Sequence, residues 1–193
     1  GLHSSEQSQA MVSDEDYVLI DRDVTSYYPA IILNCNLSPL HLTRENAFLR
    51  VYRSIVERRV EAKKRGDDVT ATVLKITANG SFGKLGSKYS ALYSPHLMIQ
   101  VTITGQLALL MLIERLEHRG FRVVSGNTDG IVIKCLRSRE NDLLDVIKWW
   151  EQATGFSTEE TRYRALFSRD VNNYLALKEK GGVKGKGALF DPW

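Results

Sequence analysis

The chain has 193 residues, 43% of them hydrophobic, and a formal net charge of +3. This length and hydrophobic content are typical of one globular domain, or of one compact core with several lobes, that buries most of its apolar surface. The two cysteines, Cys35 and Cys135, form no C-x-x-C pair, so neither a disulfide framework nor a cysteine-ligated metal site is indicated.

The N-terminal residues 1–15 are polar, and we expect them to form a flexible lead rather than a secretory signal. Without a disulfide framework, an intracellular setting is expected, either cytoplasmic or, for a viral protein, in the cytoplasm of the host. The most apolar stretch, about residues 103–113, is interrupted by Thr104, Gly105 and Gln106, so no membrane-spanning segment and no membrane partner are expected.

The next segment predicts a short buried strand over residues 17–20, which ends beside Asp21 and Asp23. The strand therefore presents carboxylates at its C-terminal end. Pro29 and the apolar residues that follow it predict a turn into a short helix.

Residues 43–65 predict one helix, with Thr43 as its N-cap. From residue 50 onward this helix holds seven Lys or Arg against two Glu, a balance that suits either a phosphate-rich partner or a solvated helix face. A turn at Gly66 and a second helix over about residues 69–83 complete an antiparallel helical hairpin.

Pro95 begins a long apolar helix that extends to about His118, with Gly120 as its C-terminal signal. The two strands that follow form a predicted β-hairpin over residues 121–135, and its tight turn carries Asp129. Further along the chain, the pattern predicts a helix over residues 140–154 and strands over residues 162–167, 173–177 and 183–186.

Asp23 and Asp129 each lie at the end of an apolar strand, and two such carboxylates can share a pair of divalent metal ions. Lys75 and Asn79 are four residues apart on the predicted second helix, so they share a face that can bind a triphosphate. Together these groups are the minimal set for nucleotidyl transfer by a two-metal mechanism. Taken singly, each aspartate is more simply a solvent-facing turn residue.

Three stretches resemble, in the same order, the polymerase motifs of family B DNA polymerases. The family pattern D-x-x-S-L-Y-P-S-I-I is matched by residues 23–32, D-V-T-S-Y-Y-P-A-I-I. The pattern K-x-x-x-N-S-x-Y-G is matched by residues 75–83, K-I-T-A-N-G-S-F-G, and Y-G-D-T-D-S by residues 125–130, S-G-N-T-D-G. A fourth stretch, residues 173–187, is similar to the family's junction between palm and thumb, and the resemblance covers about residues 17–190.

The resemblance implies an α+β fold: a polymerase palm with a ferredoxin-like antiparallel sheet, plus a fingers subdomain formed by the helical hairpin. A family member normally has a longer N-terminal part and a full thumb. We therefore expect a minimal polymerase, similar to small phage or mobile-element members, or a fragment of a longer one. The implied boundaries are a lead at 1–15, palm at 16–42, fingers at 43–86, palm again at 87–170 and the start of the thumb at 171–193.

By resemblance, Asp23, Asp129 and the backbone carbonyl of Val24 would bind two Mg²⁺ ions, for which Mn²⁺ could substitute. Lys75 would act with the aspartates in catalysis by protonating the departing pyrophosphate. The substrates would be a DNA primer-template and dNTPs, accessory replication proteins would be partners, and the chain would be a monomer.

The resemblance also assigns a set of residues to the incoming nucleotide. Tyr28 would lie beneath the sugar and exclude a 2′-hydroxyl, although a core tyrosine beside Pro29 is a simpler interpretation. The basic residues of the first helix could instead form a solvated face. Neighbouring basic residues of that helix could also be the ones that match the family's γ-phosphate contacts. The positions assigned to the triphosphate are the backbone of Ser26 and Tyr27 and the side chains of Arg59, Lys63, Lys75 and Asn79.

A further set of residues would contact DNA. Gly83 would let the template approach the backbone closely. The lysines near the C-terminus would contact phosphates, with an exposed basic hairpin as the alternative. The full set is Phe82, Gly83, Lys84, Thr128, Tyr174, Lys178, Lys184 and Lys186.

The chain departs from the family pattern at several positions. Asn127 stands where the family usually has Asp, which removes a third negative charge near the metals. Gly130 replaces a serine and is expected only to loosen the turn, while Phe82 replaces a tyrosine and lacks its minor-groove hydroxyl. Gly80 replaces a common serine, and two asparagines precede Tyr174 where the family often has lysines.

These features leave three functional interpretations. The first is the catalytic core of a DNA-templated DNA polymerase. The second is a polymerase-like module that binds primer-template with little synthesis, which three departures favour: Asn127, Gly80 and the asparagines before Tyr174. The third is a nucleotide-cyclase-like enzyme of the same topology, but such an enzyme would not need Lys75, Asn79 or Tyr174. A module that only binds DNA would not need a carboxylate at a buried strand end.

Overall fold

The computed structural model of the chain describes residues 2–6, 8–42, 47–188 and 190. It divides into two compact units. Unit 1 consists of Gly1–Thr25 and Gln106–Trp193, and unit 2 consists of Ser26–Gly105. Helices together with an antiparallel sheet confirm the predicted α+β class.

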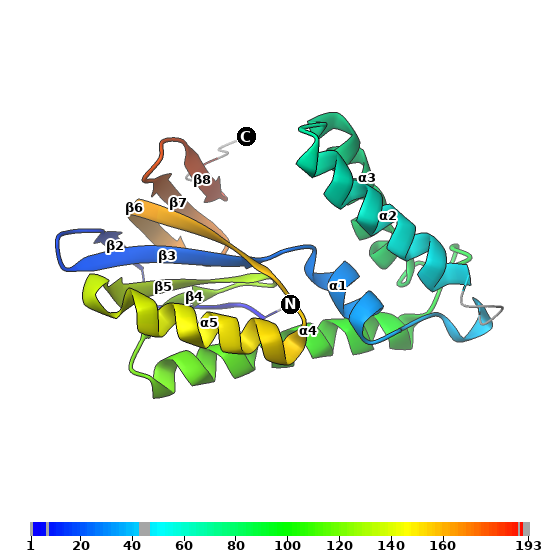
Figure 1. Cartoon of the computed structure of the whole chain (residues 1–193), viewed down its shortest axis with the longest axis horizontal. Helices are drawn as coiled ribbons and strands as arrows, with labels where there is room; N and C mark the ends of the chain where they lie inside the picture. The colour runs from blue at the N-terminus through cyan, green and yellow to red at the C-terminus, as the bar shows by residue number, and fades with distance from the viewer. Residues whose placement is uncertain (1, 7, 43–46, 189, 191–193) are drawn as a thin grey trace. The chain divides into compact units, whose positions relative to one another are not determined.

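Unit 1 is built on one antiparallel sheet in the order β1-β4-β5-β3-β6-β7-β8, with β2 also paired to β6 (Figure 1). The central strand β3 pairs with β5 on one side and with β6 on the other. The strands are β1 (Ser4–Ser5), β2 (Gln9–Val12), β3 (Tyr17–Val24), β4 (Arg122–Gly126), β5 (Gly130–Leu136), β6 (Thr158–Asp170), β7 (Asn173–Lys178) and β8 (Val183–Lys186).

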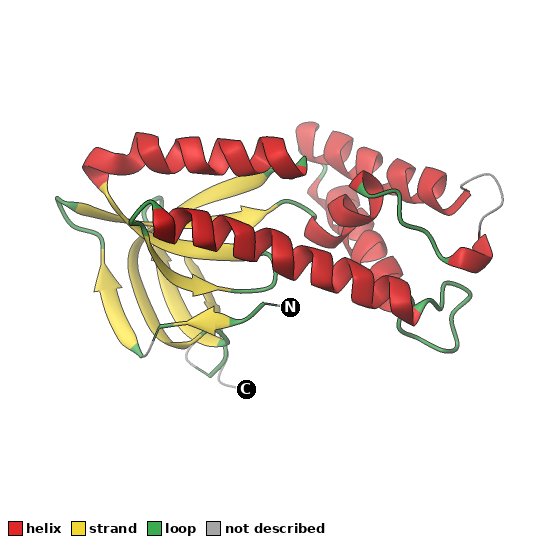
Figure 2. Cartoon of the chain, turned by 90° about the horizontal axis from the view of Figure 1, so that it is seen from below, coloured by secondary structure: helices red, strands yellow, loops and turns green. Residues whose placement is uncertain are grey.

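Helices cover one face of this sheet. They are α5 (Glu140–Thr154) and the part of α4 (Pro95–His118) that belongs to unit 1, as Figures 1 and 2 show. The indole N–H of Trp150 on α5 donates to the carbonyl oxygen of Ala108 on α4, at 2.7 Å. The apolar side chains that α4 and α5 bury are Leu109, Leu112, Leu116, Leu143, Val146, Ile147 and Trp150.

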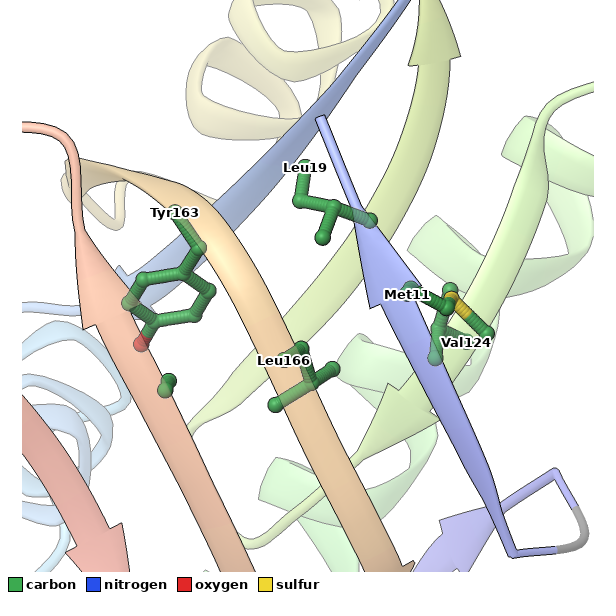
Figure 3. Packing of buried hydrophobic residues seen from close by; sticks show 6 residues of the cluster. Met11, Leu19, Val124, Tyr163 and Leu166 are labelled. Carbon is green, nitrogen blue, oxygen red and sulfur yellow. The ribbon is translucent and has the colours of Figure 1, made fainter. Parts of the chain in front are cut away.

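Successive residues of β3 point to opposite faces, so Leu19, Asp21 and Asp23 share the face away from the helices. A second, smaller apolar cluster lies on this face, and Figure 3 shows its side chains from β2, β3, β4 and β6. Its members are Met11, Leu19, Val124, Tyr163, Leu166 and Ala176. On this face of β3, the carboxylates of Asp21 and Asp23 therefore follow directly after Leu19, a member of the apolar cluster.

The N-terminal residues correct the prediction of a flexible lead. Gln9–Val12 form β2, which pairs residue by residue with β6, and Met11 is only 6% exposed. Ser4–Ser5 pair with β4. Strand β2 has four residues and one buried side chain, Met11, and polar residues precede and follow it. Its alternation is therefore too short to be recognised from the sequence.

Unit 2 is helical. It contains α1 (Tyr27–Asn34), a 3₁₀ turn η1 (Leu40–Leu42), α2 (Ala47–Lys64), α3 (Asp68–Lys84) and the first part of α4. The predicted hairpin is formed by α2 and α3, and the hydroxyl of Tyr52 on α2 donates to the carbonyl oxygen of Ala78 on α3, at 3.0 Å. Asp67 caps α3 by accepting from the Thr70 N–H at 3.0 Å. The predicted N-cap Thr43 lies outside the described residues.

Two predicted boundaries differ from the observed units. Unit 2 extends over residues 26–105, beyond the predicted hairpin segment 43–86, because α1 packs against α2 and α3. In the segment 171–193, expected to begin a thumb, strands β7 and β8 extend the sheet of unit 1, and the assignment of this segment to a thumb stays a prediction.

Among the described residues, α4 is the one helix whose length and apolar composition would let it cross a bilayer, with a mean hydropathy of 1.7 over its most apolar window. Core helices meet the same criterion. One face of α4 is buried, at Leu97, Val101, Gly105, Leu109, Leu112 and Leu116. Isoleucines and leucines also lie on the exposed face, at Ile99, Ile103, Leu107 and Leu110.

Candidate active site

The sheet of unit 1 places the two predicted aspartates at neighbouring strand ends. Asp23, near the end of β3, is paired in register with Gly130, the first residue of β5. Asp129 directly precedes Gly130, and its carbonyl oxygen accepts a 2.6 Å hydrogen bond from the N–H of Val24. The backbone therefore fixes both residues relative to one another, and the Asp129 side chain is exposed.

Asn127 shapes the turn that carries Asp129. Its side-chain oxygen accepts hydrogen bonds from the N–H of Asp129 at 3.0 Å and from that of Gly130 at 2.9 Å. A neutral amide performs this role as well as a carboxylate does, because only an acceptor oxygen is needed. Asn127 therefore retains the turn geometry while omitting a negative charge.

Gly130 does more than loosen the turn, which corrects the expectation from sequence. A Cβ atom at this position would overlap with Asp23 Oδ1 and would lie 3.0 Å from the carbonyl oxygen of Arg22. The missing side chain thus leaves space for one oxygen of the Asp23 carboxylate beside the turn that carries Asp129.

The other oxygen of Asp23 is bound by a lysine of the same unit. Lys184 Nζ lies 2.6 Å from Asp23 Oδ2 and 2.7 Å from Asp21 Oδ2. Burial alone would lower the pKa of Lys184, but the charges of Asp21 and Asp23 raise it above its ordinary range. In this structure the ammonium group of Lys184 faces these carboxylates, and its predicted contact with DNA phosphates stays a prediction.

Asp21 is the buried member of this group, with 3% of its surface exposed. Burial, followed by the charge of Asp23, raises the pKa of Asp21, and Lys184 opposes that rise. The hydroxyl of Tyr163 donates to Asp21 Oδ2. Burial and the adjacent Asp21 raise the pKa of Tyr163, so the phenol keeps the proton that it donates.

A small cavity, lined by both polar and apolar residues, adjoins these side chains. Its volume is about 20 Å³, and it is lined by Asp21, Asn127, Tyr163, Tyr174 and Lys184, among others. This volume is sufficient for one water molecule with several polar partners. Tyr174, predicted to hold the primer strand, therefore lies half-buried beside the Asp21 group.

The residues at the end of β3 fit a Mg²⁺ site. The described residues contain no cluster of three or more His, Cys, Asp or Glu that could hold a metal by protein ligands alone. Mg²⁺ does not require one, because it is usually bound by one or two carboxylates together with substrate phosphates and waters. Asp23 and Asp129 supply two carboxylates, with the backbone of Val24 beside them.

Unit 2 brings together two residues predicted to bind the triphosphate. Ser26 lies directly before α1 with φ 49° and ψ 49°, a left-handed conformation that is uncommon for serine. Its hydroxyl makes no capping hydrogen bond to α1 and instead accepts one from the guanidinium of Arg59 on α2. A left-handed residue followed by helical residues is the backbone arrangement of an anion-binding nest.

Tyr28 belongs to a stack of three aromatic rings in unit 2. Its ring lies 4.2 Å from that of Phe82, at an interplanar angle of 29°, and 6.2 Å from that of Tyr27. The Tyr27 hydroxyl donates to the carbonyl oxygen of Gly105 at 2.6 Å, and a Cβ at Gly105 would lie 3.3 Å from the Tyr27 ring. The stack therefore joins a residue predicted to contact the sugar to one predicted to contact DNA.

The remaining predicted residues of unit 2 lie on its surface. Lys75 and Asn79 are exposed on α3, Lys84 is exposed at its end, and Lys63 is exposed on α2. A Cβ at Gly83 would meet no atom within 4 Å, so packing inside the chain does not require glycine there.

In unit 1, the other predicted DNA contacts remain near the surface. Thr128 is partly exposed in the turn between β4 and β5, and Lys178 is partly exposed at the end of β7. Lys186 is exposed on β8, and its ammonium donates to the side-chain oxygen of Asn172 at 2.8 Å.

Sequence reasoning placed Asp21 at the strand end but gave it no role in the site, and it did not identify Tyr163. Asp21 could have been found, because it stands two residues before Asp23 on a strand and must share its face. Tyr163 and the new role of Lys184 carried no local signal, since they reach Asp21 through strands more than 140 residues away in the chain.

Comparisons with known proteins identify a family for this chain. Residues 46–159 match the family model described as DNA polymerase family B. The chain is 34% identical to the DNA polymerase alpha catalytic subunit of Xenopus laevis over 68% of this chain and 10% of that protein. It is 32% identical to DNA polymerase 1 of Aeropyrum pernix over 63% of this chain and 13% of that protein.

The fold has a relative among solved structures. The family B DNA polymerase from the archaeon Pyrobaculum calidifontis has a TM-score of 0.66 with this chain, at 18% identity, over 97% of this chain and 30% of that one. At this identity the likeness shows the fold alone.

The matches cover most of this chain but only part of each relative. The chain spans 10% to 27% of the length of the curated relatives above and of DNA polymerase II of Escherichia coli. The family model matches more than half of the chain, and a relative above 30% identity covers two-thirds of it. The chain therefore belongs to DNA polymerase family B.

Proposed function

We propose that this chain is the catalytic core of a DNA-templated DNA polymerase, which transfers a nucleotide from a dNTP to the 3′-hydroxyl of a primer. One observation carries the proposal: the pairing of Asp23 with Gly130 and the hydrogen bond from Val24 to Asp129 hold two carboxylates at adjacent strand ends. Membership of the family and the order of its motifs support the same assignment.

In unit 1, Asp23 and Asp129 would hold the metal ions, with the Val24 carbonyl beside them. Two bound divalent ions would activate the primer hydroxyl and neutralise charge on the leaving pyrophosphate. Gly130 keeps space for Asp23 Oδ1, and Asn127 holds the turn that presents Asp129. These residues act by keeping two oxygen ligands in fixed positions.

In unit 2, we assign the triphosphate to the turn at Ser26 and to basic side chains of α2 and α3. Arg59 already contacts the Ser26 hydroxyl, so backbone and guanidinium donors converge on one place. Lys75, with Lys63 and Asn79, would contact the phosphates, and Lys75 would protonate the departing pyrophosphate. Tyr28, held by Phe82, would exclude the 2′-hydroxyl.

The second candidate is a module that binds primer-template with little synthesis of its own. The observation that favours it is the ion pair between Lys184 and Asp23, because an ammonium group there opposes a second cation. The neutral Asn127 also disfavours a second cation, since it leaves less negative charge near the aspartates than a carboxylate would.

A primer-extension assay separates the two candidates. A labelled primer-template is incubated with Mg²⁺ and either dNTPs or rNTPs, using the unchanged chain and Asp129→Ala. A polymerase core extends the primer with dNTPs, and Asp129→Ala abolishes the extension. Asp145→Ala is the matched control, because it removes an exposed carboxylate of unit 1 on α5, away from the strand ends.

The outcomes point in different directions. Extension by both the unchanged chain and Asp129→Ala would contradict the assignment of Asp129. Binding of primer-template without extension by the unchanged chain would favour the module. The use of Mg²⁺ or Mn²⁺, the monomeric state, accessory replication proteins, a phage source and an intracellular setting stay predictions.

A further inference from the structure

The carboxylates of β3 are joined by a cation that belongs to the chain itself. Asp21 and Asp23 are two residues apart on one strand, so their side chains point to the same face of the sheet. Lys184 Nζ lies within 2.7 Å of an oxygen of each. A single ammonium group thus bridges the Asp21 side chain, which is 5% exposed, and the Asp23 side chain, which is 38% exposed.

The register of the strand pairs places Lys184 on the same face of the sheet as the two aspartates. Lys184 is paired with Ala176 on β7, and Ala176 is paired with Leu166 on β6, so all three share one face. Tyr163 on β6 holds Asp21 through its hydroxyl group. The lysine is therefore anchored at the buried carboxylate, and its contact with Asp23 extends outward from that anchor.

The two oxygens of Asp23 have different surroundings. Oδ2 is bound to Lys184, while Oδ1 faces the space left by Gly130, beside the turn that carries Asp129. A carboxylate with one oxygen occupied offers a single oxygen to a metal ion. Mg²⁺ accepts single carboxylate oxygens in near-octahedral geometry, whereas Ca²⁺ readily takes both oxygens of one carboxylate.

We propose that Lys184, anchored by Asp21 and Tyr163, is a positioning residue that holds Asp23 as a single-oxygen ligand and thereby favours Mg²⁺ over Ca²⁺ at this site. The existence of the bridge depends only on unit 1. Its effect on metal choice rests on the proposed function, because it assumes that Asp23 and Asp129 bind the metal.

The bridge is tested first without metal. In the presence of a chelator, unfolding by urea is measured for the unchanged chain, Asp23→Asn, Lys184→Met and the double variant, with a second cycle on Asp21→Asn. In each cycle, we expect the effect of the double variant on the unfolding equilibrium constant to differ from the product of the two single effects by at least about fivefold. The double variant of Asp21 and Lys184 removes both charges of the buried pair, so it should be more stable than Lys184→Met alone.

The effect on metal choice is measured by equilibrium binding of Mn²⁺, followed by its free-ion EPR signal, with Mg²⁺ and Ca²⁺ as competitors. Lys184→Met frees the second oxygen of Asp23. We expect it to tighten Ca²⁺ binding by about tenfold and Mg²⁺ binding by only about threefold, since the added ligand oxygen suits Ca²⁺.

Lys186→Met is the matched control. It removes a lysine of the same strand that is bound to Asn172 and touches neither carboxylate. It should change Ca²⁺ and Mg²⁺ affinity by the same small factor, about twofold or less, because it alters only the surrounding charge.

Additive metal-free cycles would overturn the bridge, and an unchanged ratio of Ca²⁺ to Mg²⁺ affinity in Lys184→Met would overturn its role in metal choice. An equal shift of that ratio in Lys186→Met would do the same. If Asp129→Ala leaves Mn²⁺ binding intact, the proposed function fails, while the metal-free cycles still decide whether Lys184 bridges the two aspartates.

Discussion

At Gly130 the absence of a side chain decides where a neighbouring carboxylate can lie. The strand pairing brings the α-carbons of Gly130 and Asp23 opposite one another, and any Cβ at position 130 would meet the Asp23 carboxylate. The closest overlap, with Asp23 Oδ1, involves the end of a side chain, which can move, whereas the Arg22 carbonyl oxygen at 3.0 Å and Asp23 Cα at 3.3 Å are backbone atoms that need to shift only slightly. The cost of filling the space should therefore fall on the position of Asp23 more than on stability.

Gly130→Ala is expected to lower Mn²⁺ affinity by about tenfold or more, the usual effect of displacing a ligand from its supported geometry. The measurement is Mn²⁺ titration followed by EPR, with thermal unfolding in parallel. Gly80→Ala is the control, since a Cβ there meets no atom within 4 Å and alanine favours the helix. Unchanged Mn²⁺ affinity in Gly130→Ala would show that Asp23 does not need this space.

The contact between Tyr28 and Phe82 makes a second prediction at this scale. Aromatic pairs contribute roughly 0.5–1.5 kcal/mol beyond area burial. Phe82→Ala should therefore weaken discrimination against rNTPs by about two- to tenfold, because the ring of Tyr28 is no longer supported. Single-nucleotide incorporation with dNTP and rNTP measures the ratio. Phe82→Leu, which fills much of the volume, should fall between the two, and a ratio unaffected by Phe82→Ala would contradict the assignment.

Among the helices, α3 depends on its N-terminal cap. Asp67 accepts a hydrogen bond from the Thr70 N–H. Hydrogen bonding to the side chain of Thr70, and then to its N–H, holds the pKa of Asp67 below its ordinary 3.8. A carboxyl group whose pKa is lowered by folding stabilises the folded state above its unfolded pKa. That contribution disappears as the pH falls through the folded pKa.

Asp67→Ala should therefore be less stable than the unchanged chain at neutral pH, and the difference should shrink once the pH falls below 3.8. Urea unfolding at several pH values measures it. Asp67→Asn keeps the cap without a titrating group, so its stability relative to alanine should not change with pH. A pH-independent deficit in Asp67→Ala would show that the carboxylate charge has no role.

The prediction of elements succeeded where periodicity was long. The helices at residues 95–118 and 140–154 were predicted at their observed ends, because Pro95 and a long apolar stripe mark one and a strong amphipathic pattern marks the other. The strand at 17–20 was predicted too short. Its observed continuation to Val24 contains three charged residues, whose burial or pairing depends on β5, β6 and β8.

The residues of the candidate site also differ in whether local sequence or distant strand pairing determines their position. Asp23 and Asp129 could be paired from sequence because both lie at strand ends. The bridge from Lys184 could not, because the lysine reaches Asp23 only after three successive strand pairings place β8 on the same face. Sequence spacing predicts which residue types share one element, whereas contacts between distant strands depend on register.

For the molecule as a whole, charge is divided unevenly between the units. Residues 26–105 contain eleven Lys and Arg against five Asp and Glu, and the rest of the chain contains fifteen against eighteen. The net charge of +3 therefore conceals a basic helical unit and a slightly acidic sheet unit. A polyanion should be attracted mainly to unit 2.

Arg58→Glu, an exposed position on α2, is expected to weaken duplex DNA binding. It should also reduce the slope of log affinity against log salt by about 0.9 for each phosphate that the chain no longer neutralises. Fluorescence anisotropy at several salt concentrations measures the slope. Lys148→Glu, an exposed position on α5 in unit 1, makes the same change of charge and should alter the slope much less. Equal effects would contradict a DNA-binding surface on unit 2.

The placement of β3 at the centre of the sheet has a consequence for synthesis. Its partners begin at residues 130 and 158, while the helical unit lies between them and β3 in the chain. The local contacts of α2 and α3 can form early, whereas long-range strand pairing forms slowly. Asp23 thus leaves the ribosome before the whole helical unit, yet the carboxylate reaches its working position only after β6 has been translated.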